Sequence, residues 1–210
     1  MRRAGVLILA LLPFLPAPPI RAQTAPSPEL PALNRRILEG ARHWLRRGFR
    51  YDTAWHAIEF PGGDVPADRG ACTDLIVRAL RHAGIDLQPL IRADRRARPG
   101  AYPERPIDPN LDHRLTAMQL PFFRRHARVL TTSTDPGRLA EWLPGDLVFF
   151  GTERPWHVAI VADRRAPIGV PYLIDSHPKG GGVSDRFLLT DWGPILAHFR
   201  LDEPFRPDGR

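Results

Sequence analysis

The chain has 210 residues, a formal net charge of +7 and a single cysteine. This length suits one domain with a hydrophobic core. The basic residues are scattered among acids and lack aromatic platforms, so the charge does not indicate a nucleic-acid-binding surface. The one cysteine cannot form an internal disulfide, which leaves two interpretations: a buried small side chain or a reactive thiol.

The N-terminal region has the pattern of a cleavable secretory signal. Two arginines follow Met1, residues 4–20 are apolar but interrupted by four prolines, and the small Ala22 fits a cleavage site. An uncleaved membrane anchor is the rival interpretation, and the prolines disfavour it. We therefore expect residues 1–22 to be removed, export to the periplasm or the medium, and no stable membrane anchor. A Pro-rich linker, residues 23–31, follows.

The remaining periodicity predicts helices first and strands afterwards. Helical apolar spacing covers residues 32–47, 71–83, 87–97 and 116–126. Short strand-like segments cover residues 147–150, 157–162, 172–177 and 195–201. This order predicts an α+β fold with one domain over residues 32–201 and a flexible tail, residues 202–210.

Cys72 lies at the start of the second predicted helix. The N-terminus of a helix has partial positive charge and free N–H groups, which favour a thiolate and can bind an oxyanion. On the helical wheel Cys72 falls on the apolar stripe, which also suits a core cysteine. Asp74 falls on the other side, so we expect it to be a solvated acid at the helix start and not a catalytic residue.

His157 begins a predicted strand, and the next strand places Leu173, Asp175 and His177 on one face. A hairpin of these two strands would bring Asp175 or His177 close to His157. Either side chain could orient the imidazole, and we favour Asp175 because a carboxylate also stabilises an imidazolium ion. A metal site built from these three residues is disfavoured, since no motif of metal-ligand spacing and no second cysteine supports it.

Several motifs resemble the NlpC-type cell-wall cysteine peptidases, a branch of the papain-like superfold. They are residues 70–76 (GACTDLI), 144–150 (PGDLVFF) and 157–161 (HVAIV). With the segments 61–70 (PGGDVPADRG) and 108–114 (DPNLDHR), about residues 51–201 are similar to an exported bacterial family, the domain of unknown function DUF1287. The resemblance implies a papain-like fold, with the cysteine-bearing helix packed on a small antiparallel sheet.

The resemblance also implies chemistry and site residues. Cys72 would be the nucleophile, His157 the base, and a polar residue on the following strand the third member. The chain departs from the NlpC-type pattern at Ala71 and at Thr73-Asp74, which stand where Asp and Ser-Gly are usual. Cys72 and His157 are 85 positions apart, longer than in that family, and the excess is an insertion over about residues 87–130.

The insertion contains the cluster Asp112, His113 and Arg114. These residues either line the cleft and bind a charged group of the substrate, or stabilise their own loop through ion pairs.

We expect an exported cysteine amidase or endopeptidase that acts on peptidoglycan stem peptides or another peptide, as a monomer and without a cofactor. The alternative is a catalytically silent papain-like module that binds wall peptides or a protein partner.

Overall fold

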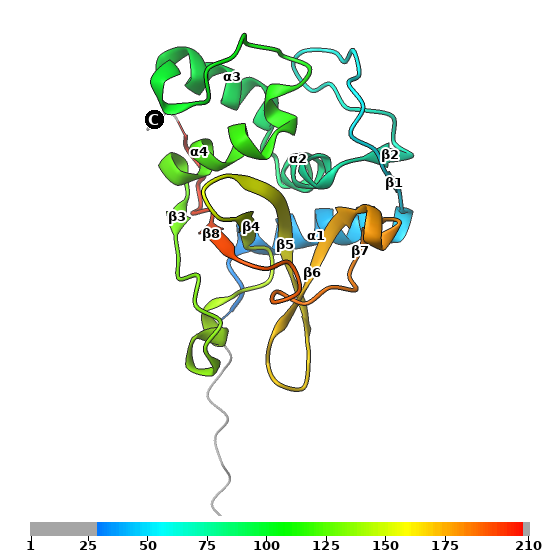
Figure 1. Cartoon of the computed structure of the whole chain (residues 1–210), viewed down its shortest axis with the longest axis vertical. Coiled ribbons are helices and arrows are strands. Elements are labelled where there is room, and N and C mark those ends of the chain that lie inside the picture. The colour runs from blue at the N-terminus through cyan, green and yellow to red at the C-terminus, as the bar shows by residue number, and fades with distance from the viewer. Residues whose placement is uncertain (1–28, 208–210) are drawn as a thin grey trace, which may run out of the picture.

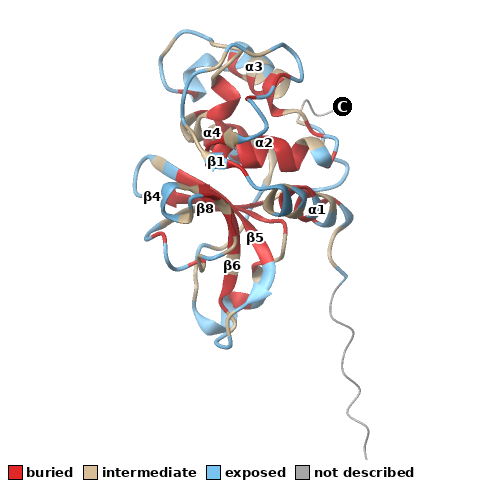
Figure 2. Ribbon diagram, turned by 90° about the vertical axis from the view of Figure 1, so that its right-hand side faces the viewer, coloured by how far each residue is buried: buried red, intermediate tan, exposed pale blue. Residues whose placement is uncertain are grey.

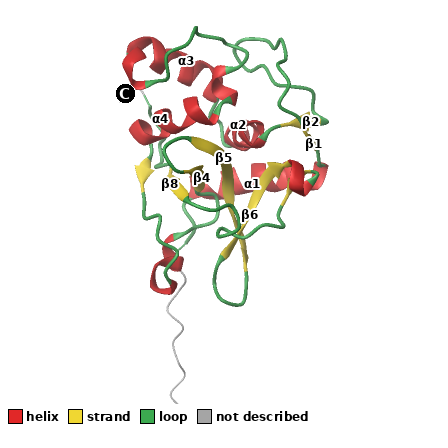
Figure 3. Cartoon of the chain, in the orientation of Figure 1, coloured by secondary structure: helices red, strands yellow, loops and turns green. Residues whose placement is uncertain are grey.

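The computed structural model describes residues 29–207. Helices dominate the first half of this range and strands the second, which confirms the α+β class (Figure 1, Figure 3). The helices are α1 (Ala32–Arg47), α2 (Cys72–His82), α3 (Leu87–Ala97) and α4 (Thr116–His126). Short 3-10 turns occupy Pro99–Ala101, Asp112–Arg114, Pro136–Glu141 and Pro178–Gly180.

The main sheet has six strands in the order β3-β8-β4-β5-β6-β7, and every neighbouring pair is antiparallel. Its strands are β3 (Arg128–Val129), β4 (Leu147–Gly151), β5 (Pro155–Arg165), β6 (Pro171–His177), β7 (Gly182–Ser184) and β8 (Ile195–Arg200). Two further short strands, β1 (Arg50–Tyr51) and β2 (Arg69–Gly70), pair in parallel beside it.

The two faces of the sheet contribute to two hydrophobic clusters, as the alternation along β5 predicts. Val158, Ile160 and Ala162 belong to the cluster that contains the helices, and Ala159 and Val161 belong to the cluster on the opposite face. Helices α1 and α2 pack against each other and against β5 and β6. Figure 2 shows that the strands and the inward sides of these helices form the buried interior.

The Pro-Gly-Asp turn before β4 joins the sheet to α1. Gly145 has φ 86°, and a Cβ there would lie 2.3 Å from the backbone oxygen of Asn34, so only glycine fits. The next residue, Asp146, is fully buried and accepts hydrogen bonds from the side chains of Asn34, His198 and Arg200. This motif therefore anchors the fold and lies outside the predicted catalytic set.

The edge strand β7 lies against the segment that follows α1. The N–H of Val183 donates to the backbone oxygen of Phe49 at 3.0 Å. A Cβ on Gly182 would lie 1.9 Å from the same oxygen, so this close approach needs glycine. Strands β3 and β7 were not predicted, because two or three residues carry too little alternation to be recognised.

The predicted signal peptide, residues 1–22, and most of the predicted linker lie outside the described residues. At the other end, residues 202–207 of the predicted tail are described, and the ring of Phe205 lies 6.3 Å from that of Phe122 on α4. Within residues 29–207, no helix has the length and apolar character that crossing a membrane requires.

Candidate active site

Cys72 is the first residue of α2, where backbone N–H groups have no acceptor within the helix. The residue before it, Ala71, is extended and serves as the N-cap. Cys72 is 6% exposed, because α2 packs against both α1 and the sheet. The packing of α2 therefore places its first turn, with the free N–H groups, beside the ends of β5 and β6.

His157 and Asp175 form a buried pair beside this turn. The imidazole Nε2 lies 2.9 Å from Asp175 Oδ2, and the two side chains are 1% and 0% exposed. Strands β5 and β6 pair Ile160 with Ile174, which brings the start of β5 beside the end of β6. Cys72 lies close enough to His157 to raise the pKa of the imidazole. Because Nε2 is occupied by Asp175, Nδ1 is the nitrogen left to face the thiol.

The surroundings of His157 favour its charged form. Burial by itself would lower the pKa of this imidazole, but the hydrogen bonds with Asp175 and Cys72, and the charges of both groups, outweigh burial and raise the pKa to about 9. This raised pKa favours the imidazolium ion at neutral pH. An imidazolium next to a thiol is the arrangement in which a cysteine can ionise and a leaving amine can be protonated.

His177, the second candidate for the third residue, lies beside His157 but does not hold it by a hydrogen bond. The two ring centroids are 5.4 Å apart in an edge-to-face arrangement. Its Nδ1 accepts the N–H of Lys179, and its pKa is lowered, first by burial and then by the charge of His157. The structure therefore brings all four predicted catalytic side chains together, with Asp175 and not His177 bonded to the imidazole.

Aromatic rings cover the free sides of His157. The Trp192 centroid lies 4.6 Å from that of the imidazole, and those of Trp156 and Phe150 lie 5.8 and 6.0 Å away. Trp192 is 5% exposed. This enclosure keeps water away from the His157–Asp175 bond, and a lower local dielectric strengthens it.

A cleft of about 160 Å³ opens beside Cys72. Tyr51 and Thr53 line it from the segment before the cysteine, and Trp156 lines it next to the imidazole. The insertion supplies the remaining wall through Leu111 and residues 114–116. Three segments that are distant in the sequence therefore shape the space in front of the thiol.

The cluster Asp112, His113 and Arg114 is buried, and its charges are used inside the protein. Asp112 pairs with Arg95 of α3, and Arg114 pairs with Asp74 of α2. His113 is 1% exposed, and its pKa falls to about 3, first because of burial and then because of the nearby charges of Arg81 and Arg114. Only Arg114 reaches the cleft. The geometry favours the interpretation in which this cluster stabilises its own loop.

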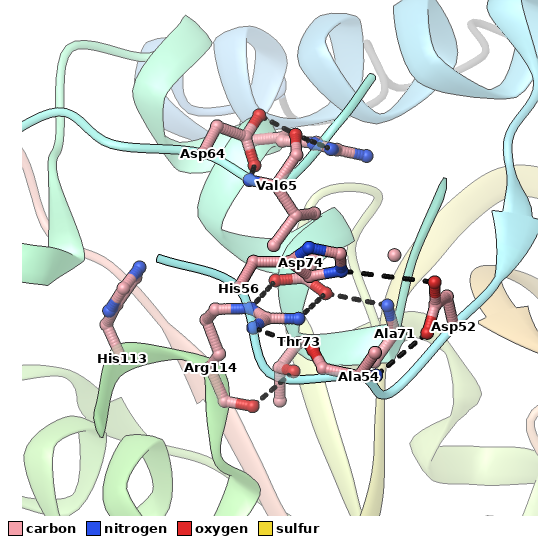
Figure 4. A network of polar contacts seen from close by, with 12 residues as sticks. Asp52, Ala54, His56, Asp64, Val65, Ala71, Thr73, Asp74, His113 and Arg114 are labelled. Atoms are coloured by element: carbon pink, nitrogen blue, oxygen red, sulfur yellow. Dashed lines mark hydrogen bonds and ion pairs between the residues drawn. The ribbon is translucent and has the colours of Figure 1, made fainter. Parts of the chain in front are cut away.

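The prediction that Asp74 is solvated is wrong. Its side chain is 2% exposed, and its carboxylate accepts the N–H of Ala71 at 2.7 Å as well as two hydrogen bonds from Arg114 (Figure 4). Alanine at the N-cap has no acceptor of its own, so the acid at the third helical position reaches back to the cap, as in half of a capping box. That spacing, Ala71 to Asp74, was the signal in the sequence that this role was available.

Comparisons with known proteins place the chain in a family. Residues 38–201 match the family described as "Domain of unknown function (DUF1287)". The Escherichia coli K12 protein named "Uncharacterized protein YijF" is 33% identical over 206 residues, which cover 91% of this chain and 96% of that protein. A solved Staphylococcus aureus structure, described as similar to a lipoprotein of the NLP/P60 family, is 18% identical with a TM-score of 0.44; the similarity covers 86% of this chain and only 45% of that one. The chain belongs to the DUF1287 family.

Proposed function

We propose that this protein is an exported cysteine hydrolase that cleaves an amide bond in a cell-wall peptide. The observation that carries the proposal is the continuous contact from Cys72 through His157 to Asp175, with the cysteine on a helix N-terminus and a cleft in front of it. A nucleophile, a base and a group that orients the base are the three components that thiolate catalysis needs.

In the first step the Cys72 thiolate attacks the carbonyl carbon of the amide, and a C–S bond forms. As the C–N bond breaks, the His157 imidazolium gives its proton to the leaving amine. Its pKa of about 9 keeps it protonated at neutral pH, so it is ready to act as this acid. The neutral imidazole then takes a proton from water, and the resulting hydroxide attacks the thioester. The C–S bond breaks, which releases the carboxylic acid and restores the Cys72 thiolate beside the His157 imidazolium.

The oxyanion formed in each step needs hydrogen-bond donors. The N–H of Cys72, at the first position of α2, points out of the helix and is the first donor. Tyr51 lines the same cleft, and burial, followed by the charges of Cys72 and Asp74, raises the pKa of its phenol. A phenol that stays protonated can donate, so Tyr51 is the second donor in this proposal.

The substrate class and the location rest on the sequence. The three motifs of the NlpC-type resemblance favour peptidoglycan stem peptides, and the signal-like pattern of residues 1–22 favours action outside the cytoplasm. The narrow cleft fits a short peptide side chain more readily than a folded protein.

The test is mass spectrometry of purified peptidoglycan after incubation with the wild type and with Cys72→Ala. Hydrolysis predicts pairs of fragments, one with a new carboxylate and one with a new amine, in the wild-type sample alone. Intact peptidoglycan that nevertheless binds both proteins equally would overturn the proposal in favour of a silent binding module. Cys72→Ser provides a second control, because its melting temperature should stay near that of the wild type.

A further inference from the structure

The insertion, about residues 87–130, binds the first turn of α2 through Arg114. Arg114 donates from Nε to Asp74 Oδ1 at 2.6 Å and from Nη2 to Asp74 Oδ2 at 3.1 Å. Its remaining nitrogen, Nη1, donates to the backbone oxygen of Ala54 at 3.3 Å. One guanidinium thus joins the nucleophile's helix to the segment that runs along the cleft (Figure 4).

The backbone of the same turn is held as well. Asp74 Oδ2 accepts the N–H of Ala71, directly before the cysteine. The hydroxyl of Thr73, directly after the cysteine, donates to the backbone oxygen of Arg114 at 2.6 Å. Gln119 donates to the backbone oxygens of both Thr73 and His113. Both neighbours of Cys72 are therefore fixed by the insertion or by its ion pair.

The charges of Asp74 and Arg114 have opposite effects on the ionisation of the Cys72 thiol. A buried carboxylate two residues from a cysteine disfavours the thiolate, because like charges at short range repel strongly away from water. Asp74 and Cys72 both belong to the first turn of α2, and the charge of each raises the pKa of the Tyr51 phenol. The guanidinium of Arg114, itself 4% exposed, supplies the compensating positive charge.

We propose that Asp74 and Arg114 are positioning residues for the nucleophile: the pair holds the backbone on both sides of Cys72, and Arg114 cancels a charge that would otherwise suppress the thiolate. The inference rests on the proposed role of Cys72. The insertion, in this view, sets the reactivity of the thiol in addition to shaping the cleft. The other ionisable groups around the thiol are those of Tyr51 on β1, His157 on β5, and Asp175 and His177 on β6. Asp52 and His56 lie near the ion pair.

The test is the rate of iodoacetamide modification of Cys72 as a function of pH in four proteins: wild type, Arg114→Gln, Asp74→Asn and the double variant. Arg114→Gln leaves an uncompensated negative charge, so its pH midpoint should rise by about one unit. Asp74→Asn leaves an uncompensated positive charge, so its midpoint should fall. The double variant restores neutrality and should return to within about 0.3 unit of the wild type. A purely structural role gives no such pair of opposite shifts.

Arg95→Gln is the matched control. It breaks another ion pair of the insertion that is almost as deeply buried, Arg95 with Asp112, which does not touch the turn of Cys72. Its midpoint should equal that of the wild type. If Arg114→Gln does not fold, the pH midpoints of Asp74→Asn and the double variant can still be compared. Their difference gives the direction in which the charge of Arg114 shifts the midpoint.

Equal midpoints in all folded variants, on a wild type that reacts well below pH 8, would overturn the inference and leave the proposed function standing. A wild-type midpoint near the free-thiol value of about 8.5 would instead count against the Cys72–His157 pair itself. Because alkylation needs no substrate, both outcomes can be read even if the natural substrate differs from the one proposed.

Discussion

Two buried histidine–aspartate pairs lie on the same sheet, and they differ in what the other side of each imidazole meets. His157 with Asp175 and His198 with Asp146 have the same Nε2–Oδ2 distance, 2.9 Å, and all four side chains are at most 1% exposed. Geometry and burial of the pair alone therefore do not separate the proposed catalytic pair from a structural one.

The other contacts of His198 and Asp146 are with groups that hold the pair in a fixed position. Nδ1 of His198 faces the backbone oxygen of Thr131 at 2.8 Å, and Trp142 stacks on the ring with centroids 3.8 Å apart. Asp146 is also bound by Arg200, which supplies its counter-charge. In the first pair, the imidazole has a thiol as its other partner. We therefore expect the third group to decide the role of an acid–histidine pair, because only a titratable nucleophile can use the proton.

Replacing each histidine by glutamine should separate the two roles most strongly. His157→Gln keeps a donor for Asp175 but no proton acceptor for Cys72, so turnover should fall on the order of 10³-fold with little change in stability. His198→Gln should leave turnover close to that of the wild type and lower the free energy of unfolding by about 2 kcal/mol, because the stack on Trp142 is lost. Steady-state turnover and urea unfolding of both variants measure these two effects. If both variants lost turnover and stability to the same extent, the two pairs would not have different roles.

A third buried histidine, His113, sharpens the contrast because it has no carboxylate bonded to it. Its folded-state pKa of about 3 lies below the unfolded value of about 6.5, so the neutral ring stabilises the fold above pH 6.5 and this contribution is lost as pH falls towards 3. At pH 4.5 the loss is about 2–3 kcal/mol. The difference in unfolding free energy between wild type and His113→Asn, measured from pH 7 to 4.5, should shrink by this amount. A constant difference would contradict the buried neutral ring.

Asp175→Asn keeps the shape of the third residue and removes its charge. We expect turnover to fall at least about tenfold, near 1.4 kcal/mol in barrier, and His177→Ala to have a smaller effect because its ring only flanks the imidazole. Steady-state kinetics on the two variants give the ranking. If His177→Ala were nearly inactive and Asp175→Asn active, the third catalytic residue would be His177, two residues further along β6.

The smallest effect is expected on the titration of His157 itself. Cys72→Ser removes a charge and weakens a hydrogen bond that both raise the pKa of this ring, so the pKa should fall from about 9 towards its usual value. NMR titration of the imidazole protons measures the change. An unaltered titration would mean that the thiol and the ring do not interact in solution.

The sequence predicted the parts of the molecule that depend on local pattern. Helices α1, α3 and α4 have the predicted bounds, and the alternation in β5 and β6 placed Asp175 and His177 on the side of His157. The environment of Asp74 could not be predicted in this way. A helical wheel tells which side of the helix a residue faces, but not that Arg114, 40 positions later in the chain, folds back to cover that side.

The same limit explains the second histidine–aspartate pair. Asp146 and His198 are 52 positions apart, one in the turn before β4 and the other in β8, and the Pro-Gly-Asp pattern carries no indication of its partner. Burial of polar groups depends on contacts between distant segments, which periodicity does not encode. By contrast, the cysteine at a helix start and the histidine at a strand start are local features, which is why both could be singled out.

The short edge strands have a consequence for association between molecules. An open sheet edge offers unpaired N–H and C=O groups, onto which a strand of another chain can add. Along β7 the N–H of Val183 is already bonded to Phe49, and the other edge is the two-residue β3, where Arg128 pairs with Asp202. Both edges thus resist strand addition, so the sheet is protected from becoming a template for aggregation at high protein concentration.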